Sequence, residues 1–345
     1  MDGRSTRLRR SDSEGPGITR TRCGRGFRYR DAAGRPVTDA AEIRRLRELV
    51  VPPAWQDVWI CPWPNGHIQA MGTDSAGRRQ YLYHQKFREQ QEAAKHDHVL
   101  AAARTLPELR TRVAEDLAAP GLTRERVPAC AARLLDLGFF RIGNESYRRD
   151  NDSYGLTTLL KEHTSCRRGE VCFTFPAKSA KEQSRTLVDG PAYRALCSLM
   201  RRRGGGPRLF VYRQGRVWHE VHAGDLNTYL RECSGTDLTA KDFRTWHATV
   251  LASVALAVSV QVSQGSRTAR KRAVTRAVRE VSEYLGNTPA VCRASYINPR
   301  TVELFEQGRT IAPVLDRLGA EASFGHPATQ GEIEAAVLRL LDGGP

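Results

Sequence analysis

Several features that would define a protein's chemistry at once are missing from this sequence. Its eight cysteines form no C-x-x-C pair, and it has no G-x-x-x-x-G-K-[ST] segment, so the sequence indicates neither a cysteine zinc site nor the use of ATP. The N-terminus has no apolar core like that of a signal peptide. The longest apolar-rich stretch, residues 248–262, includes polar residues and is short for a bilayer. We therefore expect a cytoplasmic protein with reduced thiols, no cofactor and no membrane contact.

The sequence also lacks a recognisable metal-binding motif, because its two close histidine pairs do not predict a metal site. His96 with His98, and His219 with His222, have no cysteine or carboxylate partners at a known zinc spacing. Each pair could ligate a metal, but solvated side chains are the better interpretation of both. We predict no metal centre.

Negative charge is the third shortage. The chain has 38 acidic residues against 54 basic ones, which gives a net charge of +16 and a pI ≈ 9.9. A charge of this size attracts phosphate polymers or anionic surfaces, and counterion release makes the binding salt-dependent. Nucleic acid is the first partner to consider.

The amino-acid composition and the apolar periodicity change twice along the chain. Residues 1–26 are rich in Arg, Ser and Gly without apolar periodicity, which predicts a disordered basic arm. Residues 27–90 predict a small sheet-rich domain, because short apolar runs at 58–61, 67–71 and 80–83 are separated by turn sequences. The polar stretch that follows marks the expected domain boundary.

Residues 91–345 predict a larger, mainly helical domain, and the fold class is therefore α+β. Two strand-like runs, 171–175 and 185–188, flank a lysine-bearing loop and predict a β-hairpin. The expected helices, from apolar periodicity and capping signals, are 99–117, 124–137 with Thr123 as its cap, 191–203, 223–232, 240–263, 268–284 and 332–341, and Asp39 is expected to open one more helix within residues 27–90.

The stretch from residue 285 to 300 poses the main functional question. It has a helix stop at Gly286 and a new start at Asn287, which can cap a short helix that Pro299 ends. Tyr296 belongs to this helix. It can be a half-buried packing residue, or its hydroxyl can be a nucleophile that forms an ester with phosphate.

The nucleophile interpretation needs further groups from the rest of the chain. Attack on a phosphodiester builds negative charge on the nonbridging oxygens and expels a sugar oxygen that needs a proton. Without a metal, the protein must supply fixed cations and an acid. Arginine suits the first task because its planar fork stays charged and can hold two oxygens at once, and lysine suits the second.

The blocks that could supply these groups are recognisable. Residues 140–147, F-R-I-G-N-E-S-Y, followed by N-D-S-Y-G-L-T-T-L from residue 151, closely resemble the poxvirus-like bacterial branch of the type IB DNA topoisomerases. The resemblance covers about residues 27 to 310. It also includes residues 51–58, 80–83, 175–181, 239–246 and 285–300.

The resemblance implies a catalytic set. Arg141 and Arg244 match the two arginines that contact the scissile phosphate, and Tyr296 matches the nucleophile that forms a 3′-phosphotyrosyl intermediate. Lys178 matches the hairpin lysine that serves as general acid toward the 5′-oxygen, with Lys181 as the alternative if the register differs. Alone, each of these residues would be interpreted as a surface, ion-pair or packing residue.

One position departs from the family pattern. Most members have a histidine nine residues before the tyrosine, where this sequence has Asn287. An amide can still donate a hydrogen bond to a nonbridging oxygen, although it does not bring a positive charge. The alternative is that Asn287 is chiefly a helix cap.

The resemblance also implies contacts to DNA outside the reacting groups. Lys241, three residues before Arg244, is expected near the phosphate or an adjacent minor-groove edge. Tyr147 resembles a residue that contacts the DNA backbone, while Gln80 and Tyr81 resemble groove and phosphate contacts of the N-terminal domain. A packing role is open for each tyrosine.

The function implied is that of a monomeric topoisomerase in the bacterial nucleoid. Its two domains would enclose double-stranded DNA as a clamp, and it would relax positive and negative supercoils without ATP or metal. Two alternatives remain at this point. A tyrosine recombinase shares the chemistry, but Lys241 stands where recombinases usually carry histidine. A noncatalytic DNA-binding protein would bind DNA without forming a covalent adduct.

Overall fold

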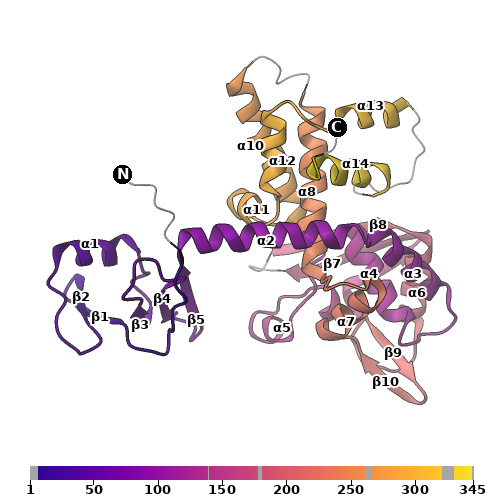
Figure 1. Cartoon of the computed structure of the whole chain (residues 1–345). Helices are drawn as coiled ribbons and strands as arrows, with labels where there is room; N and C mark the ends of the chain where they lie inside the picture. Colours follow the sequence, from indigo (N-terminus) through magenta and orange to yellow (C-terminus); the bar gives the residue numbers. More distant parts are fainter. Residues whose placement is uncertain (1–6, 139, 178–180, 261–265, 321–329, 344–345) are drawn as a thin grey trace. The chain divides into compact units, whose positions relative to one another are not determined.

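The computed structural model describes residues 7–138, 140–177, 181–260, 266–320 and 330–343 (Figure 1). The chain divides into two compact units, Met1–Lys95 and His96–Pro345, and the division falls within helix α2 (Gln85–Ala103). The polar stretch that we expected to separate the domains is therefore helical. Its Gln, Glu, Ala and Lys residues are good helix formers, and Val99 lies on the buried side of the helix.

The first unit is built on a five-stranded sheet with the order β2-β1-β3-β4-β5, in which every neighbouring pair is antiparallel. Helix α1 (Ala40–Glu48) starts where predicted, because the Asp39 side chain accepts hydrogen bonds from the backbone N–H groups of Ala41 and Glu42. Leu46 of α1 packs with Ile60 in the core of this unit. The strands are β1 (Ile18–Cys23), β2 (Gly26–Arg30), β3 (Gln56–Ile60), β4 (Ile68–Thr73) and β5 (Arg79–Tyr83).

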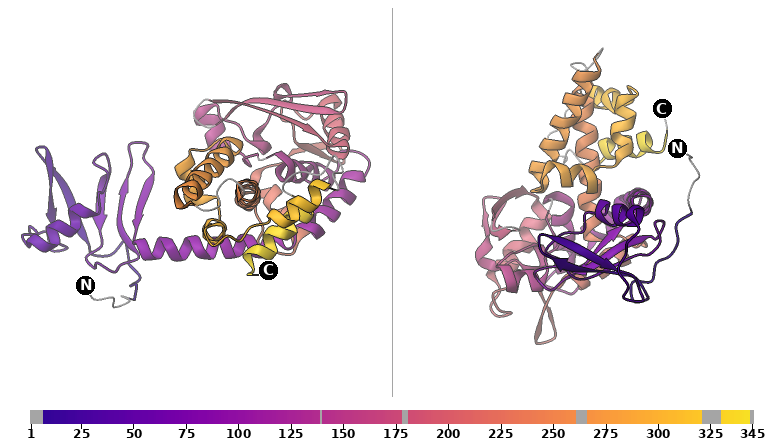
Figure 2. Two further views of the ribbon diagram at one scale, coloured as in Figure 1. Left: turned by 90° about the horizontal axis from the view of Figure 1, so that it is seen from above. Right: turned by 90° about the vertical axis from the view of Figure 1, so that its left-hand side faces the viewer.

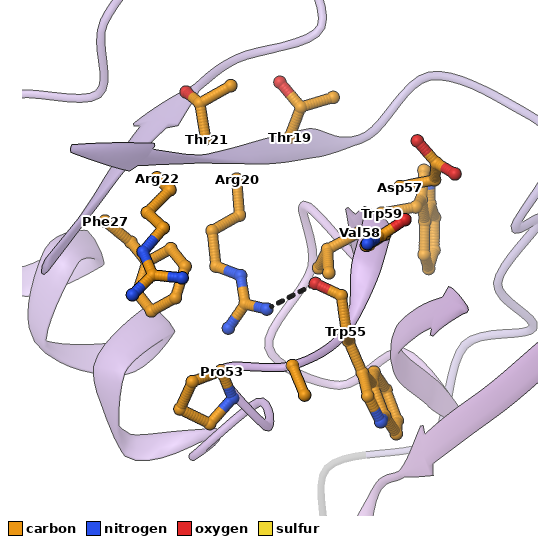
Figure 3. Close-up of a pocket in the computed structure, with 12 residues that line it drawn as sticks. Thr19, Arg20, Thr21, Arg22, Phe27, Pro53, Trp55, Asp57, Val58 and Trp59 are labelled. Atoms are coloured by element: carbon orange, nitrogen blue, oxygen red, sulfur yellow. Dashed lines mark hydrogen bonds between the residues drawn. The ribbon is translucent and has the colours of Figure 1, made fainter. Parts of the chain in front are cut away.

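The prediction that residues 1–26 form a disordered arm is wrong for the strand β1. This strand pairs along its length with β2 and, through Ile18 and Thr19, with β3. Arg20 pairs with Tyr29 of β2, and its side chain donates hydrogen bonds to the carbonyls of Val51 and Trp55. Figure 3 shows the bond to Trp55. The alternating Thr and Arg residues hide the strand in the sequence, because only Ile18 is an apolar anchor.

The second unit is mainly helical, with two small sheets. The strand order of the larger sheet is β6-β7-β8, and β9 pairs with β10. The strands are β6 (Thr164–Arg167), β7 (Glu170–Ala177), β8 (Lys181–Val188), β9 (Val211–Gln214) and β10 (Val217–Glu220). The helices are α3 (Leu106–Ala118), α4 (Arg126–Gly138), α5 (Glu145–Asn151), α6 (Gly190–Arg201), α7 (Ala223–Ser234), α8 (Ala240–Val258), α10 (Arg267–Leu285), α11 (Pro289–Ser295), α12 (Pro299–Glu306), α13 (Ala312–Ala320) and α14 (Glu332–Leu341).

The predicted α+β class, with a sheet-rich N-terminal part and a larger helical part, is confirmed. The expected hairpin is the pair β7–β8, and Thr123 accepts a hydrogen bond from the backbone N–H of Arg126 at the start of α4, as its sequence position indicated. Our prediction omitted β6, β10, α5, α12 and α13. These are short elements, and their type depends on partners distant in the sequence.

Helix α8 is the centre of the second unit. It packs against α10 and α12 on one side and against α4 and α14 on other sides. The views in Figure 1 and Figure 2 show this arrangement. A buried polar network holds it in place. The indole N–H of Trp246 donates to Glu334 Oε1 at 2.6 Å, and His247 Nε2 lies 3.4 Å from Asp136 Oδ1. Arg110 donates to both carboxylates. The start of α8 is thereby tied to three other helices.

Candidate active site

Arg244 lies in the second turn of α8 and is buried, with 5% of its surface exposed. The start of the helix is secured by Asp242, whose carboxylate accepts hydrogen bonds from the backbone N–H and the hydroxyl of Thr239. The guanidinium Nη2 of Arg244 donates to the carbonyl of Leu285 at 2.7 Å. This bond uses one of the five N–H donors of the guanidinium group.

The pKa of the Arg244 guanidinium is shifted by its surroundings. The pKa of Arg244 is lowered to about 10: burial and the nearby charge of Arg141 lower it, whereas interaction with the Tyr296 hydroxyl raises it. A pKa of about 10 leaves the side chain charged at neutral pH. These three side chains therefore act on one another electrostatically, although they are far apart in the sequence.

Arg141 lies in the segment that joins α4 to α5. Its carbonyl accepts a hydrogen bond of 2.8 Å from the backbone N–H of Leu156, and Gly155 lies directly against Gly143. A Cβ atom on Gly155 would stand 2.5 Å from the backbone nitrogen of Gly143. The close approach of two glycines thus sets the path of the backbone that carries Arg141.

Tyr296 follows the last residue of α11, so the short helix ends before Pro299, which instead begins α12. Two hydrogen bonds hold the backbone around Tyr296 against α8. Thr249 Oγ1 donates to the carbonyl of Tyr296 at 3.3 Å and accepts from the backbone N–H of Asn298 at 3.1 Å. The Tyr296 ring is half-buried, and the Arg244 Cζ atom lies 5.5 Å from its centroid. The structure brings this phenol next to a guanidinium.

Asn287 is not the cap of α11, which corrects one of the two interpretations from the sequence. The capping side chain is Thr288, whose hydroxyl accepts from the backbone N–H of Val291. Asn287 Oδ1 instead accepts a 2.7 Å hydrogen bond from Arg141 Nη2. Its Nδ2 is buried, and it has no hydrogen-bond partner among the residues that the structure describes. A buried amide donor beside Arg141 and without a protein acceptor fits contact with a ligand oxygen.

These side chains meet at the C-terminal end of α10. The carbonyls of the last turn of a helix have no partner within the helix and carry partial negative charge. Here Arg244 binds the carbonyl of Leu285, and Arg141 binds that of Gly286 at 3.0 Å. A third arginine, Arg185 of β8, donates to the carbonyl of Tyr284 at 2.8 Å. Arg185 was not among the candidates predicted from the sequence, although it shares a face of β8 with Leu187, which packs against the core.

The proposed general acid falls outside the described part of the chain. Lys178 belongs to residues 178–180, and the structure therefore does not place it. Lys181, the alternative, is the first residue of β8.

The predicted DNA-contact residues lie on surfaces. Lys241 is exposed in the first turn of α8, and Tyr147 of α5 is exposed as well. In the first unit, Tyr81 stacks on Tyr83 with ring centroids 6.0 Å apart, and Gln80 donates to Asp74 Oδ2 at 2.9 Å. The structure shows these side chains accessible or partly so, and their contacts to DNA stay a prediction.

The histidines differ partly from expectation. His96 is buried, 5% exposed, so the interpretation as a solvated side chain is wrong for it. His98 Nε2 lies 3.4 Å from Asp242 Oδ2, while His219 stacks on Tyr212. Within the described ranges, no cluster of three or more His, Cys, Asp or Glu residues is arranged to hold a metal ion. In the same part of the chain, no helix combines the length and apolarity that crossing a membrane requires.

Comparison with known proteins identifies the class. Residues 84–309 match the family profile of the eukaryotic DNA topoisomerase I catalytic core, and residues 26–74 match that of the bacterial DNA topoisomerase IB N-terminal domain. The chain therefore belongs to the type IB DNA topoisomerase family. It is an enzyme of the isomerase class that changes DNA topology, and its substrate is DNA.

A characterised relative supports the same assignment. The DNA topoisomerase 1B of Acanthamoeba polyphaga mimivirus is 30% identical over 296 residues, which cover 84% of this chain and 88% of the viral protein. The resemblance stated from the sequence blocks is confirmed.

Proposed function

We propose that this protein relaxes positively and negatively supercoiled DNA by transient cleavage of one strand. The Tyr296 hydroxyl attacks the phosphorus of a phosphodiester and loses its proton to water. The bond from phosphorus to the 5′-oxygen breaks, which leaves a 3′-phosphotyrosyl ester and a 5′-hydroxyl end. The broken strand rotates about the intact one. The 5′-hydroxyl then attacks the ester and restores both the phosphodiester and the tyrosine.

Each site residue has a defined task in this proposal. Arg141 and Arg244 neutralise the charge that develops on the nonbridging oxygens, and Asn287 donates its Nδ2 hydrogen to one of them. Lys178 gives a proton to the leaving 5′-oxygen and takes it back during religation. The energy of the broken bond is kept in the ester, so the cycle consumes no ATP. The arginines fill the electrophilic role that a metal has in other phosphoryl-transfer sites.

The observation that carries the proposal is the convergence of Arg244, Arg141 and Tyr296 at the end of α10. Arg244 interacts with the Tyr296 hydroxyl, and the charge of Arg141 acts on Arg244. The net charge of +16 supports binding to duplex DNA, which we propose the two units enclose as a clamp, with Lys241, Tyr147, Gln80 and Tyr81 as contacts. We further propose that the enzyme acts as a monomer on DNA of the bacterial nucleoid.

The test is relaxation of supercoiled plasmid in EDTA and without ATP, with both signs of supercoiling. Wild-type protein should relax both substrates and, when denatured rapidly, should remain attached to a 3′ DNA end. The Tyr296→Phe variant should bind DNA with unchanged affinity and do neither. Failure of the wild type to relax the plasmid, or equal relaxation by the phenylalanine variant, would show that the proposal is wrong.

A further inference from the structure

Three consecutive backbone carbonyls at the C-terminal end of α10 each accept a hydrogen bond from a different arginine. The backbone N–H groups of Gly286 and Asn287 bind the carbonyls of Glu283 and Ser282, which completes the usual hydrogen bonds of a helix end. The next three carbonyls, those of Tyr284, Leu285 and Gly286, each accept from one guanidinium Nη2. The arginines come from β8, from α8 and from the α4–α5 segment. They are thereby gathered by one structural feature.

The third of these, Arg185, is held in place and is not a mobile surface cation. Its strand β8 alternates, so Gln183, Arg185 and Leu187 share the inner face. Leu187 packs against the main core of the unit. Gln183 reaches the helix end, where its Nε2 would stand 2.5 Å from a Cβ on Gly286. Arg185 lies between Gln183 and Leu187 on the strand, and its Nη2 donates a hydrogen bond to the carbonyl of Tyr284.

No carboxylate of the described residues forms an ion pair that balances the charge of Arg185. Burial lowers the pKa of Arg185, and its charge lowers the pKa of Arg244. Among the described residues, the ion pairs include neither Arg185 nor Arg141. Carbonyl dipoles stabilise a guanidinium but do not neutralise it. Half-buried cations that repel one another cost free energy, and an anionic ligand recovers it.

We propose that Arg185 is a third phosphate-binding arginine of this site and contacts a DNA phosphodiester, either the scissile one or its immediate neighbour. This proposal rests on the function proposed above. The bound Nη2 keeps the guanidinium oriented, and its other N–H donors are available to phosphate oxygens. Its charge adds to those of Arg141 and Arg244.

The test separates the charge of Arg185 from its structural hydrogen bond. Arg185→Gln keeps an N–H donor for Tyr284 but loses the charge, whereas Arg185→Lys keeps the charge. Arg167→Ala, which removes an exposed arginine of β6 in the same sheet, is the matched control. The measurement is the single-turnover rate of covalent adduct formation at saturating DNA. We expect a loss of roughly ten- to a hundredfold for the glutamine variant and much less for the lysine variant.

Neutralised DNA linkages then identify the phosphate. The substrates are duplexes that carry one methylphosphonate, either at the cleavage site mapped with wild-type protein or at one flanking position. If Arg185 binds a given phosphate, the Arg185→Gln defect shrinks to within about threefold on the duplex that lacks that charge, because interacting partners are not additive. Shrinkage at the cleavage site assigns the scissile phosphate, and shrinkage at a flank assigns the neighbour.

Two results would overturn the proposal. One is an Arg185→Gln rate equal to that of wild type, as expected for Arg167→Ala. The other is an equal defect on every duplex, which would make Arg185 a purely structural residue. Both leave the proposed function intact. A wild-type protein that forms no adduct through Tyr296 would instead overturn the proposed function.

Discussion

Arg141 donates a hydrogen bond of 2.7 Å from Nη2 to Oδ1 of Asn287, and within the described part of the chain the buried Nδ2 group of the same amide has no hydrogen-bond partner. Arg141 therefore orients the amide through its oxygen, which leaves the nitrogen as a donor. In the proposed mechanism, this neutral donor, oriented by a neighbouring cation, takes the place where members of the family usually carry histidine.

The first prediction concerns this amide. Asn287→Ala should lower the rate of adduct formation by roughly tenfold or more, because a hydrogen bond to a charged oxygen contributes about 1.5–3 kcal/mol. Asn287→His should leave the rate intact or raise it. Single-turnover cleavage measures both. Thr288→Ala is the control: it removes the cap of α11 and should cost about 1 kcal/mol of stability with little effect on the rate. Complete inactivation by Asn287→His would contradict this account.

The second prediction separates catalysis from binding. Arg141→Ala and Arg244→Ala should each reduce cleavage at saturating DNA by about 10²- to 10³-fold, because their benefit lies in the transition state. The DNA dissociation constant, measured at one fixed salt concentration, should change by much less. Weaker binding with an unchanged rate at saturation would demote both arginines to binding residues. Thermal unfolding provides a control for Arg244, whose side chain is buried.

The third prediction concerns acid stability. Burial opposes ionisation of Asp136, but hydrogen bonds from His247 and Arg110, and their charges, hold the pKa of this carboxyl well below its usual range. A carboxyl with a depressed folded-state pKa stabilises the fold above its unfolded pKa of about 3.9, and this contribution is lost as pH falls below that value. Stability of the second unit should therefore fall steeply below about pH 4.

A variant assigns that pH dependence to the network. Asp136→Asn should reduce the free energy of unfolding at pH 7 by about 3–5 kcal/mol, because it leaves Arg110 with one fewer buried counter-charge, and it should flatten the acid profile. Denaturant titrations at several pH values measure this. Asp150→Asn, which changes an exposed carboxyl of α5, should alter neither quantity. An unchanged acid profile in Asp136→Asn would place the titrating group elsewhere.

The fourth prediction concerns the backbone that carries Arg141. Gly155→Ala places a Cβ 2.5 Å from Gly143 N, so the segment must shift, at a cost of about 1–3 kcal/mol. Both the melting temperature and the cleavage rate should fall. Gly224→Ala in α7 is matched to it, because a Cβ there meets nothing within 4 Å and alanine favours the helix. If Gly155→Ala melts lower but cleaves normally, the close approach of the glycines does not position Arg141.

Local signals in the sequence predicted much of the helical framework. The side chains of Asp39 and Thr123 begin α1 and α4 as their positions indicated, because capping depends on contacts a few residues away. The polar stretch of α2 was interpreted as a domain boundary although its residues are good helix formers. Strand β1 was missed because its partners are distant in the sequence. Ile18 pairs with Ile60, and Arg20 binds the carbonyls of Val51 and Trp55; neither partner is visible in a local pattern.

The sequence alone determined the family, because its blocks are ordered and specific, and it named Tyr296, Arg141 and Arg244 as candidates with a chemical reason. It left open whether Asn287 caps a helix, and it did not indicate Arg185. The tertiary structure decided the first in favour of Thr288 and brought Arg185 to the end of α10. The physical reason is that the last carbonyls of α10 have no partner within the helix and accept hydrogen bonds from arginines elsewhere in the fold. These arginines lie up to about a hundred residues apart in the chain, so no local pattern in the sequence shows that they meet.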